Sequence, residues 1–101
     1  MNRKKRSDRR HIVYQIVNAI NDEIYLGITQ GFRQKDLKIR FQKHIRRALT
    51  EDKSWTLCKA IRKYGPESFT ASILTVVRGK AAAHQLEREW IAEYKPKLNS
   101  K

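Results

Sequence analysis

Cysteine is almost missing from this 101-residue sequence, which contains only Cys58. A single thiol cannot form an intrachain disulfide and has no second cysteine at zinc-ligand spacing, so we expect it to be buried and inert. The sequence also lacks the run of about 18 apolar residues that a membrane-spanning helix needs, and no apolar region follows the basic start Met1–Arg6. These absences exclude a membrane span and a secretory signal, and we expect a cytoplasmic protein with no membrane partner.

Acidic residues are scarce as well. Ten Asp and Glu stand against 23 Lys and Arg, which gives a formal net charge of +13. Such an excess usually marks a polyanionic partner, and we expect DNA bound mostly through its backbone. Residues 1–10 are nearly all charged or polar and predict a disordered basic arm, although a solubilising tail fits the sequence equally well. The arm residues expected to contact phosphates are Arg3, Lys4, Lys5 and Arg6.

Residues 11–101 are enough for one domain with a modest core. Two stretches, Ile12–Val17 and Ile24–Thr29, are rich in β-branched and aromatic residues, with turn-forming residues between them, and predict a β-hairpin. Because side chains alternate along a strand, an even number of loop residues would put Tyr14 and Tyr25 on one face. An odd number would separate the two phenols.

Apolar residues then recur at helical spacing over residues 34–50, over about 54–64 and over 79–94. Gly65-Pro66 ends the second of these helices, and Ser54 is a plausible N-cap for it. Between the second and third helices, residues 69–77 are β-rich and predict a third strand. The sequence therefore predicts an α+β fold with three strands and about three helices. We assign the aromatic residues Trp55, Phe69 and Trp90 to packing.

Three polar residues stand beside the apolar stripes of these helices. Arg40 and His44 lie one turn apart in the first helix, and Glu87 lies on the apolar side of the last helix. A buried carboxylate is costly unless it is paired, neutralised or bound to a metal. Alternatives stay open, because Arg40 and His44 could belong to a solvated basic face and Glu87 could pair with an exposed Lys or Arg. The tyrosines could equally be ordinary strand aromatics. His11 and His84 have no partners at metal-ligand spacing, and we expect them at the surface.

In their order and spacing, these features resemble the GIY-YIG nuclease domain, particularly the compact catalytic domain of phage- and intron-encoded homing endonucleases. Tyr14 stands where the first family motif has its tyrosine, and Tyr25-Leu26-Gly27 matches the second motif. Ile12 departs from the pattern, since the first motif has Gly there. The resemblance covers about residues 12–99. Its other matches are Arg40, His44, the segment 60–69, Glu87 and Leu98-Asn99.

The resemblance implies a small three-stranded antiparallel sheet flanked by helices, and a metal-dependent DNA endonuclease that acts in a bacterial or phage-infected cell. Phosphodiester hydrolysis needs a base, positive charge on the phosphate and a stabilised leaving oxygen. Tyr14 is the candidate base, Arg40 would hold the phosphate, and Glu87 would hold one Mg²⁺ or Mn²⁺ ion. Tyr25 and His44 would position the water or relay the proton.

The substrate is less narrowly specified. Lys43, Arg47 and Asn99 are further expected DNA contacts. The nuclease module fills the sequence, so recognition would come from the helices, the arm or a separate partner, and the protein would act as a monomer or transient dimer, by nicking or by double-strand cleavage. The alternative function is a non-catalytic basic module of the same fold that binds nucleic acid, because the net charge predicts binding with or without chemistry.

Overall fold

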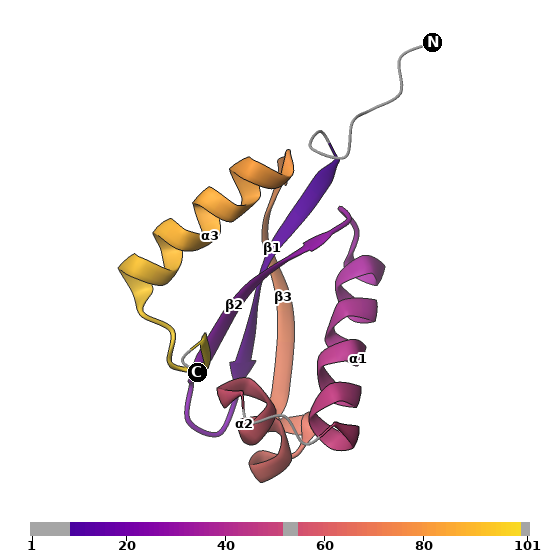
Figure 1. Cartoon of the computed structure of the whole chain (residues 1–101). Helices are drawn as coiled ribbons and strands as arrows, with labels where there is room; N and C mark the ends of the chain where they lie inside the picture. The colour runs from indigo at the N-terminus through magenta and orange to yellow at the C-terminus, as the bar shows by residue number, and fades with distance from the viewer. Residues whose placement is uncertain (1–8, 52–54, 100–101) are drawn as a thin grey trace.

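The structure, a computed structural model, describes residues 9–51 and 55–99. Its centre is a three-stranded antiparallel sheet with the order β2-β1-β3, built from β1 (Arg10–Asn18), β2 (Ile24–Gln30) and β3 (Phe69–Arg78) (Figure 1). The middle strand, β1, is the most buried of the three, as its central position requires. The predicted α+β class, the hairpin and the third strand are confirmed.

Three helices flank the sheet: α1 (Gln34–Thr50), α2 (Thr56–Tyr64) and α3 (Lys80–Tyr94). Short 3₁₀ turns, η2 (Pro66–Ser68) and η3 (Lys97–Asn99), follow α2 and α3. Gly65 ends α2 with φ 87°, a conformation that favours glycine, so the predicted stop is confirmed. The predicted N-cap Ser54 lies outside the described residues, and Trp55 occupies the N-cap position of α2.

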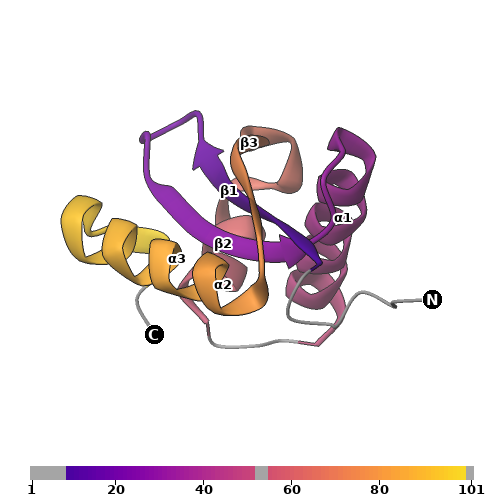
Figure 2. The ribbon, with the colours of Figure 1, turned by 90° about the horizontal axis from the view of Figure 1, so that it is seen from above.

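The helices form two layers around the sheet. Figures 1 and 2 show α1 and α3 on opposite faces. On the α1 side, Ile12, Tyr14 and Ile16 of β1 pack with residues of α1 and α2 in the main core. On the other side, α3 lies over β2 and leaves an apolar groove between Leu26 and Trp90. The central strand is therefore buried on both faces over His11–Tyr14, and β2 forms one edge of the sheet.

The strand register decides where the tyrosines point. Tyr14 pairs with Gly27, and Ile16 pairs with Tyr25, across an antiparallel ladder. Because directly paired residues share a face, and Tyr14 and Ile16 are two residues apart, both phenols lie on the α1 side. The loop after Val17 thus has the even length that keeps them together.

Several smaller predictions can be compared with the structure. Cys58 is buried, as expected. His11 is only 7% exposed and its Nδ1 lies 2.8 Å from the carbonyl oxygen of Arg9, so its predicted surface position is wrong. Arg10, the last residue of the expected arm, already belongs to β1. The arm residues Arg3, Lys4, Lys5 and Arg6 lie outside the described residues. No described helix has the length and apolarity to cross a membrane.

Candidate active site

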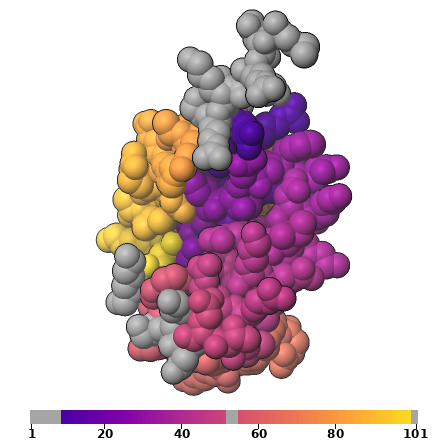
Figure 3. Space-filling model, turned by 45° about the vertical axis from the view of Figure 1, so that its right-hand side comes forward, coloured from indigo at the N-terminus to yellow at the C-terminus, as the bar shows by residue number. Residues whose placement is uncertain are grey.

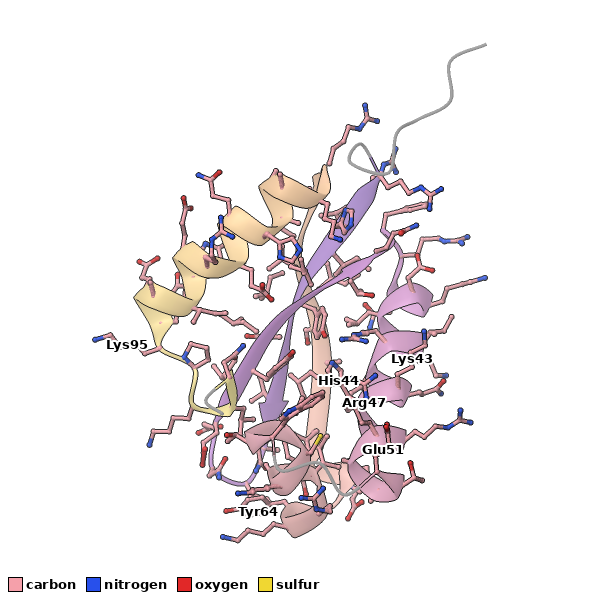
Figure 4. The ribbon with its side chains drawn as sticks, in the orientation of Figure 1. Lys43, His44, Arg47, Glu51, Tyr64 and Lys95 are labelled. Carbon is pink, nitrogen blue, oxygen red and sulfur yellow. The ribbon has the colours of Figure 1, made fainter. Side chains whose placement is uncertain are left out.

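The centre of the site is a hydrogen bond between the sheet and α1. The hydroxyl oxygen of Tyr14 lies 2.8 Å from Nε2 of His44, and both residues are buried. Figure 4 shows His44 on the sheet side of α1. His44 shares the buried stripe of α1 with Leu37 and Ala48, so it does not belong to a solvated face.

Burial leaves both members of this pair uncharged near neutral pH. It raises the pKa of Tyr14, the nearby Tyr25 phenol raises that pKa further, and the Arg40 guanidinium opposes both effects. Burial also lowers the pKa of His44 to about 4, and the positive charges of Arg40 and Arg47 lower it further. A protonated phenol and a neutral imidazole can share one proton along their hydrogen bond.

Tyr25 completes an aromatic cluster. Its ring centroid lies 6.2 Å from that of Tyr14 and 5.3 Å from that of His44. Gly27 makes this packing possible, because a Cβ atom there would lie 2.7 Å from the Tyr14 hydroxyl and 2.8 Å from Cε1 of Tyr25. A glycine inside a strand often marks such a close approach, so this role could have been suspected from the sequence.

Arg40 brings positive charge to the cluster from α1. Burial raises the pKa of both Tyr14 and Tyr25, and the Arg40 guanidinium opposes that rise. Its buried Nε has no hydrogen-bond partner among the residues that the structure describes. A buried donor without an acceptor costs about 1–3 kcal/mol. Arg40 is therefore ready to bind an anion, and a phosphate oxygen is a suitable acceptor.

Tyr25, Arg40 and His44 open into a cleft of about 360 Å³. Among the described residues, no Asp or Glu lines it. Its walls also include Arg47 and Trp55. Trp55 is 44% exposed, so its assignment to packing is wrong. The other two packing assignments differ in outcome. Phe69 belongs to the buried core, whereas Trp90 is half-buried and lines the apolar groove beneath α3.

Asn99 fixes the edge strand beside the cleft. Its Oδ1 accepts a hydrogen bond from the Leu26 amide at 2.7 Å, and its Nδ2 donates to the Leu26 carbonyl at 2.7 Å. Leu26 stands between Tyr25 and Gly27, so this pair of bonds holds the strand that carries the second tyrosine. Both polar groups of the amide are used within the protein, and the expected contact of Asn99 with DNA stays a prediction.

Glu87 reaches the site from the other layer. Figure 3 shows β2, in purple, between α1 in magenta and α3 in orange to yellow. Burial raises the pKa of Glu87, and the Glu87 charge raises the pKa of Tyr25, so the carboxylate lies on the Tyr25 side of the cluster. His84 Nδ1 lies 3.9 Å from Glu87 Oε1. Glu87 does not line the cleft with Arg40 and His44.

The comparison with protein families fits this geometry. The GIY-YIG catalytic domain matches residues 10–99, almost the whole chain. The chain belongs to the GIY-YIG family. Its predicted resemblance is therefore confirmed, and the protein is a GIY-YIG nuclease domain. Ile12, which replaces the Gly of the first family motif, is fully buried in the core.

Two solved structures share the fold of this GIY-YIG domain. The catalytic domain of the homing endonuclease I-TevI is 27% identical, with a TM-score of 0.70, and the alignment covers 89% of this chain and 94% of that one. A mutant of the catalytic domain of intron endonuclease I-TevI is 26% identical, with a TM-score of 0.71 and 90% of both chains covered. No curated protein matches the sequence.

The donor set limits how this GIY-YIG domain could hold a metal ion. In residues 9–51 and 55–99, no three His, Cys, Asp or Glu side chains form a group that could bind one. Near the aromatic cluster, Glu87 offers a partly shielded carboxylate with 20% of its side chain exposed. One carboxylate suits Mg²⁺, which keeps several of its waters, and does not suit zinc, which needs several protein ligands.

The predicted DNA contacts on α1 occupy different surroundings in the GIY-YIG domain. Lys43 is exposed and lies with Arg40 along a shallow depression near the end of β2. Arg47 is partly buried, its Nε lies 3.3 Å from Glu51 Oε2, and it lines the cleft. Figure 4 shows Lys43 and Arg47 on α1 and Glu51 at its C-terminal end.

Proposed function

We propose that this GIY-YIG domain is a divalent-metal-dependent DNA endonuclease that hydrolyses phosphodiester bonds. One observation carries the proposal: a buried hydrogen bond joins Tyr14 to His44, and His44 lines a cleft together with Arg40. Among the described residues, Arg40 Nε has no hydrogen-bond partner and no Asp or Glu lines the cleft. A basic binding module has no need for a buried phenol and imidazole in contact. Such a pair does suit proton transfer.

Arg40 would hold the scissile phosphate. The guanidinium is always charged, and its planar donors match phosphate oxygens in pairs. An oxygen bound at Nε would satisfy the buried donor that lacks a partner among the described residues. Because the bound charge grows as water attacks phosphorus, Arg40 would stabilise the transition state more than the substrate.

Tyr14 would accept the proton of the attacking water. Its raised pKa keeps the phenol protonated, so it can act as a base only if it passes its own proton onward. His44 Nε2 lies at hydrogen-bond distance, and with a pKa near 4 the imidazole is free to accept that proton at neutral pH. The proton would then move from water to Tyr14 as the phenol proton moves to His44. Tyr25 would position the water beside them.

Glu87 would hold one Mg²⁺ or Mn²⁺ ion. When bound, the ion would supply positive charge to the oxygen that leaves phosphorus. Burial raises the pKa of Glu87 because the shielded carboxylate is poorly solvated. The positive charge of a neighbouring cation would stabilise the ionised carboxylate and lower its pKa.

DNA would approach over the cleft face of α1. The net charge of +13 favours backbone contacts, and Lys43 and Arg47 would neutralise phosphates on either side of Arg40. One such site cuts one strand at a time, so a monomer would nick DNA and a transient dimer would cut both strands. A separate partner could add sequence specificity.

Incubation of supercoiled plasmid with the protein and Mg²⁺, or Mn²⁺, tests this proposal. Wild type should convert the plasmid to nicked circles, and Arg40→Ala and Glu87→Ala should reduce the rate at least 100-fold. Arg46→Ala, an exposed α1 control, should stay within a few fold of wild type. Plasmid binding without nicking by wild type would favour the non-catalytic module, and equal nicking by Glu87→Ala would remove the metal assignment.

A further inference from the structure

Trp55 occupies an unusual place for a large apolar side chain. It is 44% exposed and lines the same cleft as Tyr25, Arg40 and His44. Leaving much of an indole in water forgoes the free energy that its burial would supply. An exposed aromatic surface that opens into a catalytic cleft is therefore suited to contact a ligand.

Arg47 stands beside this indole in a fixed position. Its Cζ atom lies 5.4 Å from the centroid of the Trp55 ring, within range of a cation–π interaction. From the other side, the ion pair with Glu51, 3.3 Å long, restrains the same guanidinium. The cleft thus presents the exposed ring of Trp55 together with two guanidinium groups, those of Arg40 and Arg47.

This combination matches the chemistry of an unpaired nucleotide. A base stacks on an aromatic side chain, while the phosphate attached to it pairs with a cation. A paired duplex would use the arginines but not the indole, because each base inside a duplex is already stacked on both faces. The cleft volume of about 360 Å³ lies at the lower end of the range for small-ligand sites, about 300–1,000 Å³.

We propose that Trp55 and Arg47 form a nucleotide subsite next to the scissile phosphate. An unpaired base stacks on Trp55, and Arg47 binds the phosphate of that nucleotide. This inference rests on the proposed function, in which Arg40 holds the scissile phosphate. Its consequence is a substrate class: DNA with an unpaired nucleotide beside the cut, as at a splayed end or a branch, is preferred over uniformly paired duplex.

Fluorescence tests the stacking step without any cleavage. The chain has two tryptophans, so Trp90→Phe leaves Trp55 as the only indole emitter. This variant is titrated, in EDTA, with a labelled duplex that has a splayed single-stranded arm and with a fully paired duplex, while anisotropy of the label follows binding. The splayed duplex should quench Trp55 emission at saturation more strongly than the paired duplex. Equal or absent quenching at saturation would overturn the proposal.

Matched variants test the preference itself. Trp55→Leu should lose about 5- to 150-fold in affinity for the splayed duplex, with little change for the paired one. Trp55→Phe should keep most of the preference, because it retains an aromatic face. Phe32→Leu is the control. Phe32 is 48% exposed and also has guanidinium groups over its ring, those of Arg10 and Arg33, but it lies outside the cleft.

These experiments separate the subsite from the catalytic proposal. If no protein cleaves DNA but Trp55 still discriminates the splayed duplex, the catalytic assignment fails and the subsite stands. If wild type nicks plasmid and Trp55→Leu shows the wild-type ratio of affinities for the two duplexes, the subsite is wrong and the catalytic proposal stands.

Discussion

The hydroxyl oxygen of Tyr14 lies 2.8 Å from Nε2 of His44, a contact between residues 30 positions apart in the sequence. It joins the central strand to α1 inside the core. A buried phenol and a buried imidazole each require a polar partner, and here each satisfies the other. The same bond provides the proton path that the proposed reaction uses.

The first prediction concerns the pH dependence of cleavage. The pKa of His44 is lowered to about 4, so the neutral imidazole that accepts the proton persists well below neutral pH. Protonation of His44 should therefore slow nicking only as the pH approaches about 4. Protonation of Glu87, whose pKa burial raises, would weaken metal binding, so the profile is measured at saturating Mg²⁺. A pH–rate profile under single-turnover conditions measures this. An acidic limb centred near pH 6.5, the ordinary histidine value, would contradict the assigned state of His44.

The second prediction concerns stability. The folded pKa of His44 is below its ordinary value of 6.5, so the unfolded chain binds more protons between these two values. The contribution of His44 to the free energy of unfolding should be fully present above pH 6.5. It should decrease by about 3 kcal/mol as the pH drops through 4. Glu87 acts in the opposite sense, because its raised pKa makes the folded state bind its proton more tightly.

Urea unfolding at several pH values measures this free energy. His44→Gln removes the titrating group and should flatten the profile, while exposed Lys43→Gln serves as the control and should keep its slope. A difference in the free energy of unfolding between wild type and His44→Gln that stays constant between pH 6.5 and 4 would show that His44 is not held neutral by burial.

The third prediction concerns Gly27. An added Cβ would lie 2.7 Å from the Tyr14 hydroxyl, so Gly27→Ala must displace the phenol or the strand. We expect a loss of stability of about 1–3 kcal/mol. We also expect nicking activity to fall by more than the decrease in the folded fraction would cause. Denaturant unfolding and single-turnover nicking measure the two effects. Gly79→Ala, at a turn with φ 97° outside the cleft, should lower stability and leave activity per folded molecule unchanged.

The fourth prediction concerns Asn99, whose amide makes two hydrogen bonds of 2.7 Å to Leu26. Asn99→Ala should cost about 1–3 kcal/mol in stability, because it leaves polar groups of the edge strand unpaired. If its role is to hold β2, amide hydrogen exchange of Leu26 should accelerate, while affinity for DNA should stay close to wild type. A loss of affinity without faster exchange would assign Asn99 to direct DNA binding.

The fold could be predicted closely because its determinants are local. The strands, the bounds of α1 and the end of α2 at Gly65 follow from residue pattern and turn chemistry. The shared face of Tyr14 and Tyr25 depended on one further fact, the even length of the loop after Val17, and the register confirms it. Glu87 was expected on an apolar side of its helix, and it is half-buried there.

The partners within the site could not be predicted, because they come from distant elements. Helical spacing placed His44 beside the apolar stripe, whereas its bond to Tyr14 draws it into the core. The bonds of Asn99 join residues 73 positions apart, and no periodic pattern reports such a contact. Trp55 was assigned to packing because the sequence does not show which aromatic residues the helices leave exposed.

Tyr14→Phe tests the central claim most directly. This substitution keeps the buried ring and removes only the hydroxyl that contacts His44. Single-turnover nicking of plasmid with Mg²⁺ is compared between Tyr14→Phe, wild type and Tyr94→Phe, which removes a hydroxyl from an exposed tyrosine on α3. The account predicts a rate about 100- to 10,000-fold lower for Tyr14→Phe, and an unchanged rate for the control. Nicking by Tyr14→Phe at the wild-type rate would contradict the assignment of Tyr14 as the base.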